Sequence, residues 1–172
     1  MLLNVGPRPE GRIADPDVDR LRDLGLWMML YGEAVRGIRP WVVTNEGDIW
    51  LTHRPSDGTV YAIVDLDYDL GPSKPTKQPG RMVTLKSVKA APETKVTLLS
   101  QSGNLEWKED GEGIHIKVER KQTVQLIRKP QKGTSGPEKT EAAIAIAWGP
   151  DWPVAVKITN ARPAENFGGK EK

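Results

Sequence analysis

Cysteine is absent from the 172-residue sequence, and histidine is scarce. Without cysteine the chain can form neither a disulfide nor a thiolate-based zinc site or nucleophile. The two histidines, His53 and His115, lie far apart in apolar, strand-like runs, where a histidine is most often structural. They do not form a metal-ligand cluster. We therefore expect neither a metal site nor a cofactor.

Long apolar runs and a strong net charge are also lacking. No run approaches the roughly 20 apolar residues needed to span a membrane, and the first residues lack the basic and apolar regions of a signal peptide. The 25 Lys and Arg residues nearly balance the 23 Asp and Glu residues, giving a formal net charge of +2. This charge is too small to favour nucleic acid or an anionic membrane as a partner. The most basic stretch, residues 117–132, alternates with apolar residues, which favours a solvated strand face over an anion site.

One helical pattern stands out, and it covers residues 15–31. Its apolar residues recur at helical spacing; they are Val18, Leu21, Leu24, Trp27, Met28 and Tyr31. Asp15 is predicted to be the N-cap, with Pro16 at the first helical position. Gly32 is predicted to end the helix.

The segment around this helix has the order of a βα unit. Residues 1–5 read as a short apolar strand, a Gly-Pro-containing turn follows, and residues 32–41 read as a loop after the helix. Such units normally belong to a parallel sheet or barrel with sister units on both sides. The first 41 residues are therefore predicted to be one βα unit left over from a TIM-like barrel.

The pattern of residues changes after Trp41, where short runs typical of strands alternate with residues typical of turns. Residues 48–54 and 59–66 read as a hairpin joined by the turn at residues 55–58. Further strands are predicted at residues 81–88, 95–100, 104–108, 113–119, 123–127, 142–148 and 153–159. Eight or nine short strands predict a mainly β fold, an antiparallel β-sandwich over residues 42–165. Residues 166–172 are predicted to be a frayed tail.

Several segments resemble a known family. LLNVGPRPEGRI at residues 2–13, the helix, and GEAVRGIRPW at residues 32–41 resemble the end of the catalytic barrel in α-L-fucosidases of glycoside hydrolase family 29. Residues 58–64, 95–116 and 150–160 resemble strands of the C-terminal sandwich of that family. The loop departs from the family at Arg36 and Ile38, where an aromatic and a small hydroxyl residue are usual, and Ala14 and Tyr31 also depart.

This resemblance implies that the chain is the C-terminal portion of a retaining α-L-fucosidase, which hydrolyses terminal α-L-fucosyl linkages. The nucleophile and the acid/base of the family lie upstream, so no catalytic residue is assigned in this chain. The implied partners are a fucosylated glycan, bound by the complete enzyme, and the catalytic barrel portion. A periplasmic or extracellular location is expected for the complete enzyme. Two alternatives stay open: a carbohydrate-binding sandwich, and the second half of a split fucosidase.

Four residues are candidates for substrate contacts. Asn4 would lie at the rim of the expected active-site face, where it could support a residue from another strand. Glu33 lies in the loop after the helix, where a structural hydrogen-bond acceptor is the favoured interpretation. Trp148 and Trp152 flank a Gly-Pro-Asp turn and are the best candidates for stacking on a sugar ring.

The other four tryptophans are given packing roles. Trp27 is predicted to lie on the apolar face of the helix, and Trp50 and Trp107 to point into the core from strands. Trp41 is predicted to pack where the barrel unit meets the sandwich.

Overall fold

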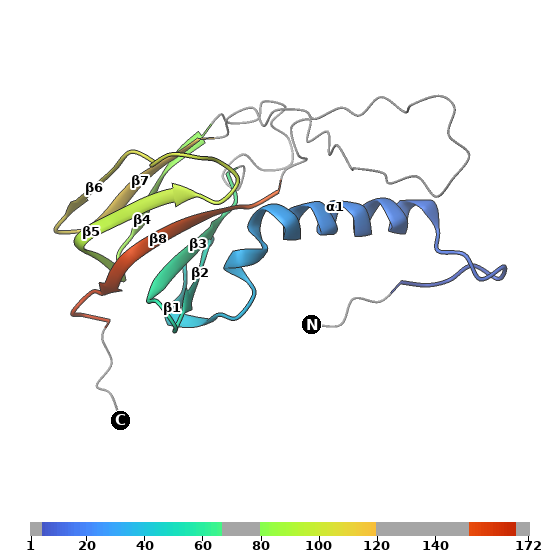
Figure 1. Ribbon diagram of the computed structural model, residues 1–172, viewed down its shortest axis with the longest axis horizontal. Coiled ribbons are helices and arrows are strands. Elements are labelled where there is room, and N and C mark those ends of the chain that lie inside the picture. Colours follow the sequence, from blue (N-terminus) through green and yellow to red (C-terminus); the bar gives the residue numbers. More distant parts are fainter. Residues whose placement is uncertain (1–4, 67–79, 120–151, 168–172) are drawn as a thin grey trace, which may run out of the picture.

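Two stacked antiparallel sheets, preceded by one helix, make up the structure (Figure 1). The computed structural model describes residues 5–66, 80–119 and 152–167. The elements are α1 (Asp15–Tyr31), the 3-10 turn η1 (Gly32–Ala34), β1 (Arg39–Glu46), β2 (Ile49–Arg54), β3 (Thr59–Val64), β4 (Gly80–Leu85), β5 (Val88–Leu98), β6 (Trp107–Asp110), β7 (Gly113–Glu119) and β8 (Val154–Pro163). The predicted fold class, a mainly β antiparallel sandwich, is confirmed.

The larger sheet has the strand order β1-β2-β3-β8-β5, and the smaller sheet has the order β4-β7-β6. Every neighbouring pair is antiparallel. The hairpin of β2 and β3 confirms the predicted one. The pairing of β3 with β8 joins distant parts of the chain, with Val60 opposite Ile158 and Val64 opposite Val154.

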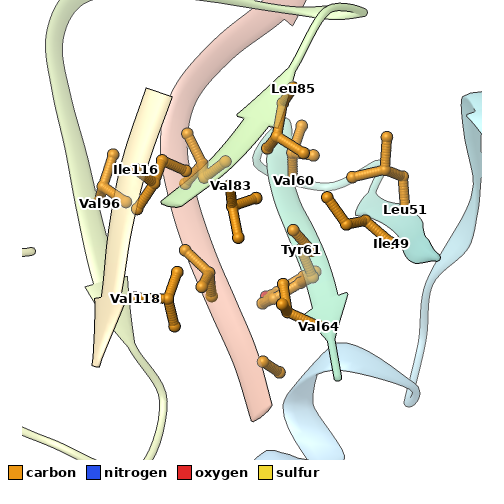
Figure 2. Packing of buried hydrophobic residues seen from close by; sticks show 14 of the residues in the cluster. Ile49, Leu51, Val60, Tyr61, Val64, Val83, Leu85, Val96, Ile116 and Val118 are labelled. Atoms are coloured by element: carbon orange, nitrogen blue, oxygen red, sulfur yellow. The ribbon is translucent and has the colours of Figure 1, made fainter. Parts of the chain in front are cut away.

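The hydrophobic core fills the space between the two sheets (Figure 2). Alternate residues of each strand point into it. The smaller sheet contributes Val83, Leu85, Ile114, Ile116 and Val118, and the larger sheet contributes Ile49, Leu51, Val60, Ala62, Val96, Val156 and Ile158. This burial of β-branched and leucine side chains on both inner faces drives the stacking of the sheets.

Trp50 does not belong to this core, so its predicted position was wrong. Its neighbours Ile49 and Leu51 are buried, and the period of two along a strand therefore places Trp50 on the outer face. There 55% of its surface is exposed. Trp107 is half-buried and packs against the core, as predicted.

The helix has the predicted bounds, but its start differs in detail. Ala14, not Asp15, is the N-cap residue, with φ −63° and ψ 139°. The carbonyl of Ala14 accepts hydrogen bonds from the backbone N–H groups of Asp17 and Val18, so the helical ladder begins there. Asp15 instead lies in the first turn, where its charge interacts favourably with the positive end of the helix dipole.

The loop predicted at residues 32–41 is shorter than expected. Gly32–Ala34 forms η1, and Arg39–Trp41 already belongs to β1. Pro40 is compatible with this strand because β1 is an edge strand of its sheet, where a missing N–H is tolerated. The division of the chain at residue 41 stays a prediction.

Strand β5 is longer than the segment predicted for it and is irregular in the middle. Its register with β8 shifts between Ala90 and Lys95, and Glu93 has a φ of 65°. The segment predicted at residues 95–100 covers only the second part of β5, and residues 89–94 were assigned to a break between strands. The predicted strands at 123–127 and 142–148, the first four residues and residues 168–172 lie outside the described residues.

Gly113 is required by the backbone at the start of β7. Its φ is +139°, and an added Cβ would lie 2.3 Å from the carbonyl oxygen of Leu85. Gly111, in the same turn, has no atom within 4 Å of such a Cβ. The smaller sheet therefore tolerates a side chain at one of these glycines only.

We expect Gly113→Ala to lower the free energy of unfolding of the full chain by roughly 2 kcal/mol or more, from backbone strain and overpacking together. Gly111→Ala is the matched control and should change it by less than about 0.5 kcal/mol. Urea denaturation followed by circular dichroism measures both values. Equal stability of the two variants would contradict the described geometry.

Candidate functional site

One carboxylate oxygen of Glu33 gathers three donors on the outer face of the larger sheet. Oε1 accepts a hydrogen bond from the Tyr61 hydroxyl at 2.8 Å and another from Lys157 Nζ at 2.7 Å. Arg54 forms an ion pair with the same oxygen at 3.1 Å. The Arg54 guanidinium also lies over the Tyr61 ring, 5.4 Å from its centroid. We call these four residues the Glu33 cluster.

Strand register brings the donors of the Glu33 cluster together. Tyr61 of β3 is directly opposite Lys157 of β8, so the two side chains lie side by side on one face. Arg54 ends the neighbouring strand β2 and is held by Asp57 at 3.3 Å. Glu33 itself comes from η1, directly after the helix. The cluster thus joins the helical segment to three strands of the sheet.

The electrostatics of the cluster favour an ionised Glu33. Burial tends to raise the pKa of this carboxyl, but the hydrogen bonds from Lys157, Tyr61 and Arg54 outweigh it and hold the pKa below 4.5, its ordinary value. Burial and the adjacent carboxylate raise the pKa of the Tyr61 hydroxyl, which stays protonated as a donor. At neutral pH the cluster is a carboxylate surrounded by three donors.

Three further hydrogen bonds attach the end of α1 and η1 to the sandwich, one to strand β2, one to the turn after β5 and one to the residue before β8. Thr52 Oγ1 donates to the carbonyl of Ala34 at 2.9 Å. The Tyr31 hydroxyl donates to Ser100 Oγ at 3.1 Å, and Trp27 Nε1 donates to the carbonyl of Pro153 at 2.8 Å. Together with the Glu33 cluster they form what we call the docking joint. Its chemistry is that of an attachment between two structural units.

The predicted substrate-contact residues fall in different places. Asn4 and Trp148 lie outside the described residues. Glu33 lies in the docking joint, and Trp152 is half-buried directly before Pro153, whose carbonyl belongs to that joint. The structure brings these two near one attachment surface. Their contact with substrate stays a prediction.

The remaining aromatic and histidine residues have structural contacts. Trp27 is half-buried and packs against the core, and Trp41 is buried, with Nε1 donating to Ser87 Oγ at 3.2 Å. His53 Nδ1 lies 3.0 Å from the carbonyl of Pro40. His115 lies between Thr84 Oγ1 at 3.0 Å and Asp110 Oδ1 at 2.9 Å. These contacts are consistent with packing and hydrogen-bonding roles for both histidines.

Sequence reasoning missed three members of the Glu33 cluster, namely Arg54, Tyr61 and Lys157. One signal for Tyr61 was present in the sequence. The strand TVYAIV has apolar side chains at neighbouring positions, so both of its faces need cover. In the structure Tyr61 is fully buried although it is on the outer face, because η1 lies over it.

A second feature is a polar groove of about 660 Å³. It lies between the β6–β7 turn, the start of β5 and the segment that follows β8. Cationic side chains from β5 and β8 line it, and so does the ring of Phe167. The groove holds no residue of the docking joint.

Within residues 5–66, 80–119 and 152–167, no group of three or more His, Asp and Glu side chains is placed to hold a metal ion. The same ranges contain no helix that is long and apolar enough to cross a membrane.

Comparison with known proteins assigns the family. The model of the alpha-L-fucosidase C-terminal domain matches residues 43–130, about half of the chain. The chain belongs to this domain family. The earlier resemblance to the C-terminal portion of an α-L-fucosidase is confirmed.

Relatives of known name are fucosidases. An alpha-L-fucosidase of Branchiostoma floridae is 32% identical over 130 residues, which are 73% of this chain and 26% of that protein. The tissue alpha-L-fucosidase of Mus musculus is 34% identical over 121 residues, which are 68% of this chain and 24% of that protein. The chain therefore spans about a quarter of the length of the curated relatives it matches.

Solved structures share the fold. A family GH29 alpha-L-fucosidase from Bacteroides thetaiotaomicron matches 98% of this chain and 29% of its own, with a TM-score of 0.55 and 15% identity. The Thermotoga maritima alpha-fucosidase, solved with a mechanism-based inhibitor, matches 92% and 30%, with a TM-score of 0.52 and 21% identity. At these identities the likeness shows the fold alone.

Replacing Glu33 tests the docking joint. Glu33→Gln removes the charge and should lower the free energy of unfolding at pH 7 by roughly 0.5–1 kcal/mol, since solvent screens this partly exposed group. Because the folded-state pKa is depressed, the contribution of Glu33 is fully present above pH 4.5 and is lost as the pH falls through the folded-state pKa.

The difference between the parent chain and Glu33→Gln should therefore shrink below about pH 4.5. Denaturant titrations between pH 3 and pH 8 measure it. Glu10→Gln, at an exposed turn residue, is the control and should leave stability unchanged. A Glu33→Gln effect that persists unchanged at pH 3 would contradict the ion-paired cluster.

Proposed function

We propose that this chain is the C-terminal part of an α-L-fucosidase and acts as a structural complement to a catalytic barrel. The complete enzyme would hydrolyse terminal α-L-fucosyl linkages with retention. The observation that carries this proposal is the docking joint, which fixes a lone helix to a sandwich of the fucosidase C-terminal family.

The helix itself supports a further packing partner. Only its C-terminal end reaches the strands, and the rest extends away from them (Figure 1). A helix of this length is marginal in water without tertiary packing. Val18 and Met29 lie eleven positions apart, close to three full turns, and so share one side of the helix. Met29 is 70% exposed, which fits an apolar contact with the barrel.

The carboxyl groups around Arg54 are poorly suited to acid catalysis of glycoside hydrolysis, since the pKa values of Glu33 and Asp57 are both lowered. Retention needs two carboxyl groups about 5–5.5 Å apart, one of them protonated when the reaction begins. Glu33 is the one acidic residue among the predicted substrate contacts. Three donors occupy its Oε1 and lower the pKa of its carboxyl group. An ionised, ion-paired carboxylate is a poor general acid. We infer that catalytic groups come from the barrel.

Reconstitution tests the proposal. The full chain would be mixed with a separately expressed barrel portion of an α-L-fucosidase that lacks its own C-terminal domain. We expect the mixture to hydrolyse a chromogenic aryl α-L-fucoside at least several-fold faster than the barrel portion alone, and the chain alone to be inactive. Hydrolysis by the chain alone, or no gain and no co-elution in the mixture, would refute the proposal.

A charge on the exposed side of α1 should break this assembly. Met29→Glu is expected to lower the reconstituted activity at least tenfold, because a buried unpaired carboxylate is costly at an apolar interface. Met82→Glu is the matched control. Met82 is 60% exposed but lies on β4, in the other sheet, and its variant should retain the parent activity. Equal losses in both variants would argue against α1 as the contact.

A further inference from the structure

The polar groove lies at the end of the sandwich farthest from α1. Strand β8 begins beside the helix and ends at the opposite end of the molecule (Figure 1). The groove is formed there, by the residues around Pro163, the start of β5 and the Gly111–Gly113 turn. Its volume of about 660 Å³ is in the range of small-molecule sites. The groove therefore lies beyond the docking joint along β8, with Arg162 five residues after Lys157.

Two cations face each other in this groove. Lys89 of β5 is directly opposite Arg162 of β8, and like charges in directly opposite positions repel. Lys89 Nζ lies 3.9 Å from a carboxylate oxygen of Glu109. In the described part of the chain, Arg162 forms no ion pair with any carboxylate.

The lining includes a third cation, Lys86, and two acids, Glu112 and Glu165, while the Glu109 carboxylate beside Lys89 partly offsets the charge of that lysine. Neither acid pairs with Arg162 or Lys86 within the described ranges. An anion placed between Lys89 and Arg162 would relieve their repulsion and make charge-assisted hydrogen bonds. Arg162 offers a planar fork of donors that matches a carboxylate or a sulfate.

Other features of the groove fit a sugar better than a bare anion. The ring of Phe167 is 38% exposed and lines the groove, and an exposed aromatic ring can pack against the C–H face of a pyranose. Asn166 supplies an amide with two donors and an acceptor. Gly111, whose Cβ position is open, leaves its backbone accessible to a ligand. The volume is also far larger than an inorganic anion requires.

We propose that this groove binds an anionic saccharide, with a carboxylate or sulfate group held between Arg162 and Lys89 and a sugar ring packed on Phe167. The saccharide part of the proposal rests on the proposed function, since a fucosidase acts on glycans. The site would hold a charged part of a glycan away from the catalytic barrel. It differs from the substrate contacts considered at Glu33 and Trp152.

Calorimetric titration of the full chain tests this with four probes: trigalacturonic acid, a sulfated galactotriose, neutral galactotriose and inorganic sulfate. At least one charged trisaccharide should bind saturably. The neutral trisaccharide and inorganic sulfate show whether the negative charge and the sugar are each required for binding. Arg162→Gln should weaken that binding at least tenfold. Arg20→Gln removes the same charge from the exposed surface of α1 and should leave binding unchanged. Phe167→Leu should weaken the trisaccharide several-fold and leave inorganic sulfate unaffected.

Each outcome decides a part of the proposal. Preference for trigalacturonic acid identifies a carboxylate as the ligand group, and preference for the sulfated probe identifies a sulfate. Equal binding of neutral galactotriose overturns the anionic specificity, equal binding of inorganic sulfate overturns the saccharide, and no binding of any probe overturns the site. Lys89→Gln removes the other cation of the pair; it should weaken the binding of the charged trisaccharide by a similar factor and keeps the proposal testable if Arg162→Gln unfolds. No hydrolysis is measured here, so this result is independent of the reconstitution assay.

Discussion

The antiparallel pairing of β8 with β3 is the interaction on which the rest of the structure depends. It brings residues 154–158 beside residues 60–64 and completes the larger sheet. The same register places Lys157 beside Tyr61, which creates the binding surface for Glu33. On its other edge β8 pairs with β5 and sets Arg162 opposite Lys89. One strand thus organises the core, the docking joint and the groove.

The two ends of β8 lie in chemically different surroundings. At the first end, a carbonyl accepts from Trp27, and the charges of Glu33, Arg54 and Lys157 are paired with one another and with Asp57. Such a closed network stabilises an attachment but leaves little free capacity for a ligand. At the other end, Arg162 projects into a groove without a carboxylate partner among the described residues. The contrast assigns a structural role to one end and a binding role to the other.

Local patterns predicted much of the fold. The helix bounds followed from apolar spacing, and the β2–β3 hairpin followed from alternation on both sides of a turn. Trp50 was placed in the core because it lies in a strand, but the buried Ile49 and Leu51 on either side fix its side chain on the opposite face. Strand β1 was missed because Pro40 is a poor strand former except at an edge, and edge position depends on the whole sheet.

The candidate site was harder to predict than the fold, because it depends on how distant strands pair in the sheet. The sequence favoured Glu33 as a structural hydrogen-bond acceptor, but the donors that surround it come from three strands. Their proximity depends on the β3–β8 register, which joins segments about ninety residues apart. The cation pair in the groove depends equally on the register of β5 with β8 and on the bulge between Ala90 and Lys95. Such pairings between distant strands cannot be predicted from the local residue patterns of one sequence.

The irregular edges of the larger sheet have a consequence for how copies of this chain behave together. Both edge strands, β1 and β5, contain a proline, Pro40 and Pro92, and both shift register partway along. Part of the β5 edge is also covered, since the Leu105 N–H donates to the Val96 carbonyl at 2.8 Å. Bulges and prolines interrupt the row of free backbone groups that would otherwise recruit another strand. These irregularities disfavour the addition of a further strand at either edge of the larger sheet.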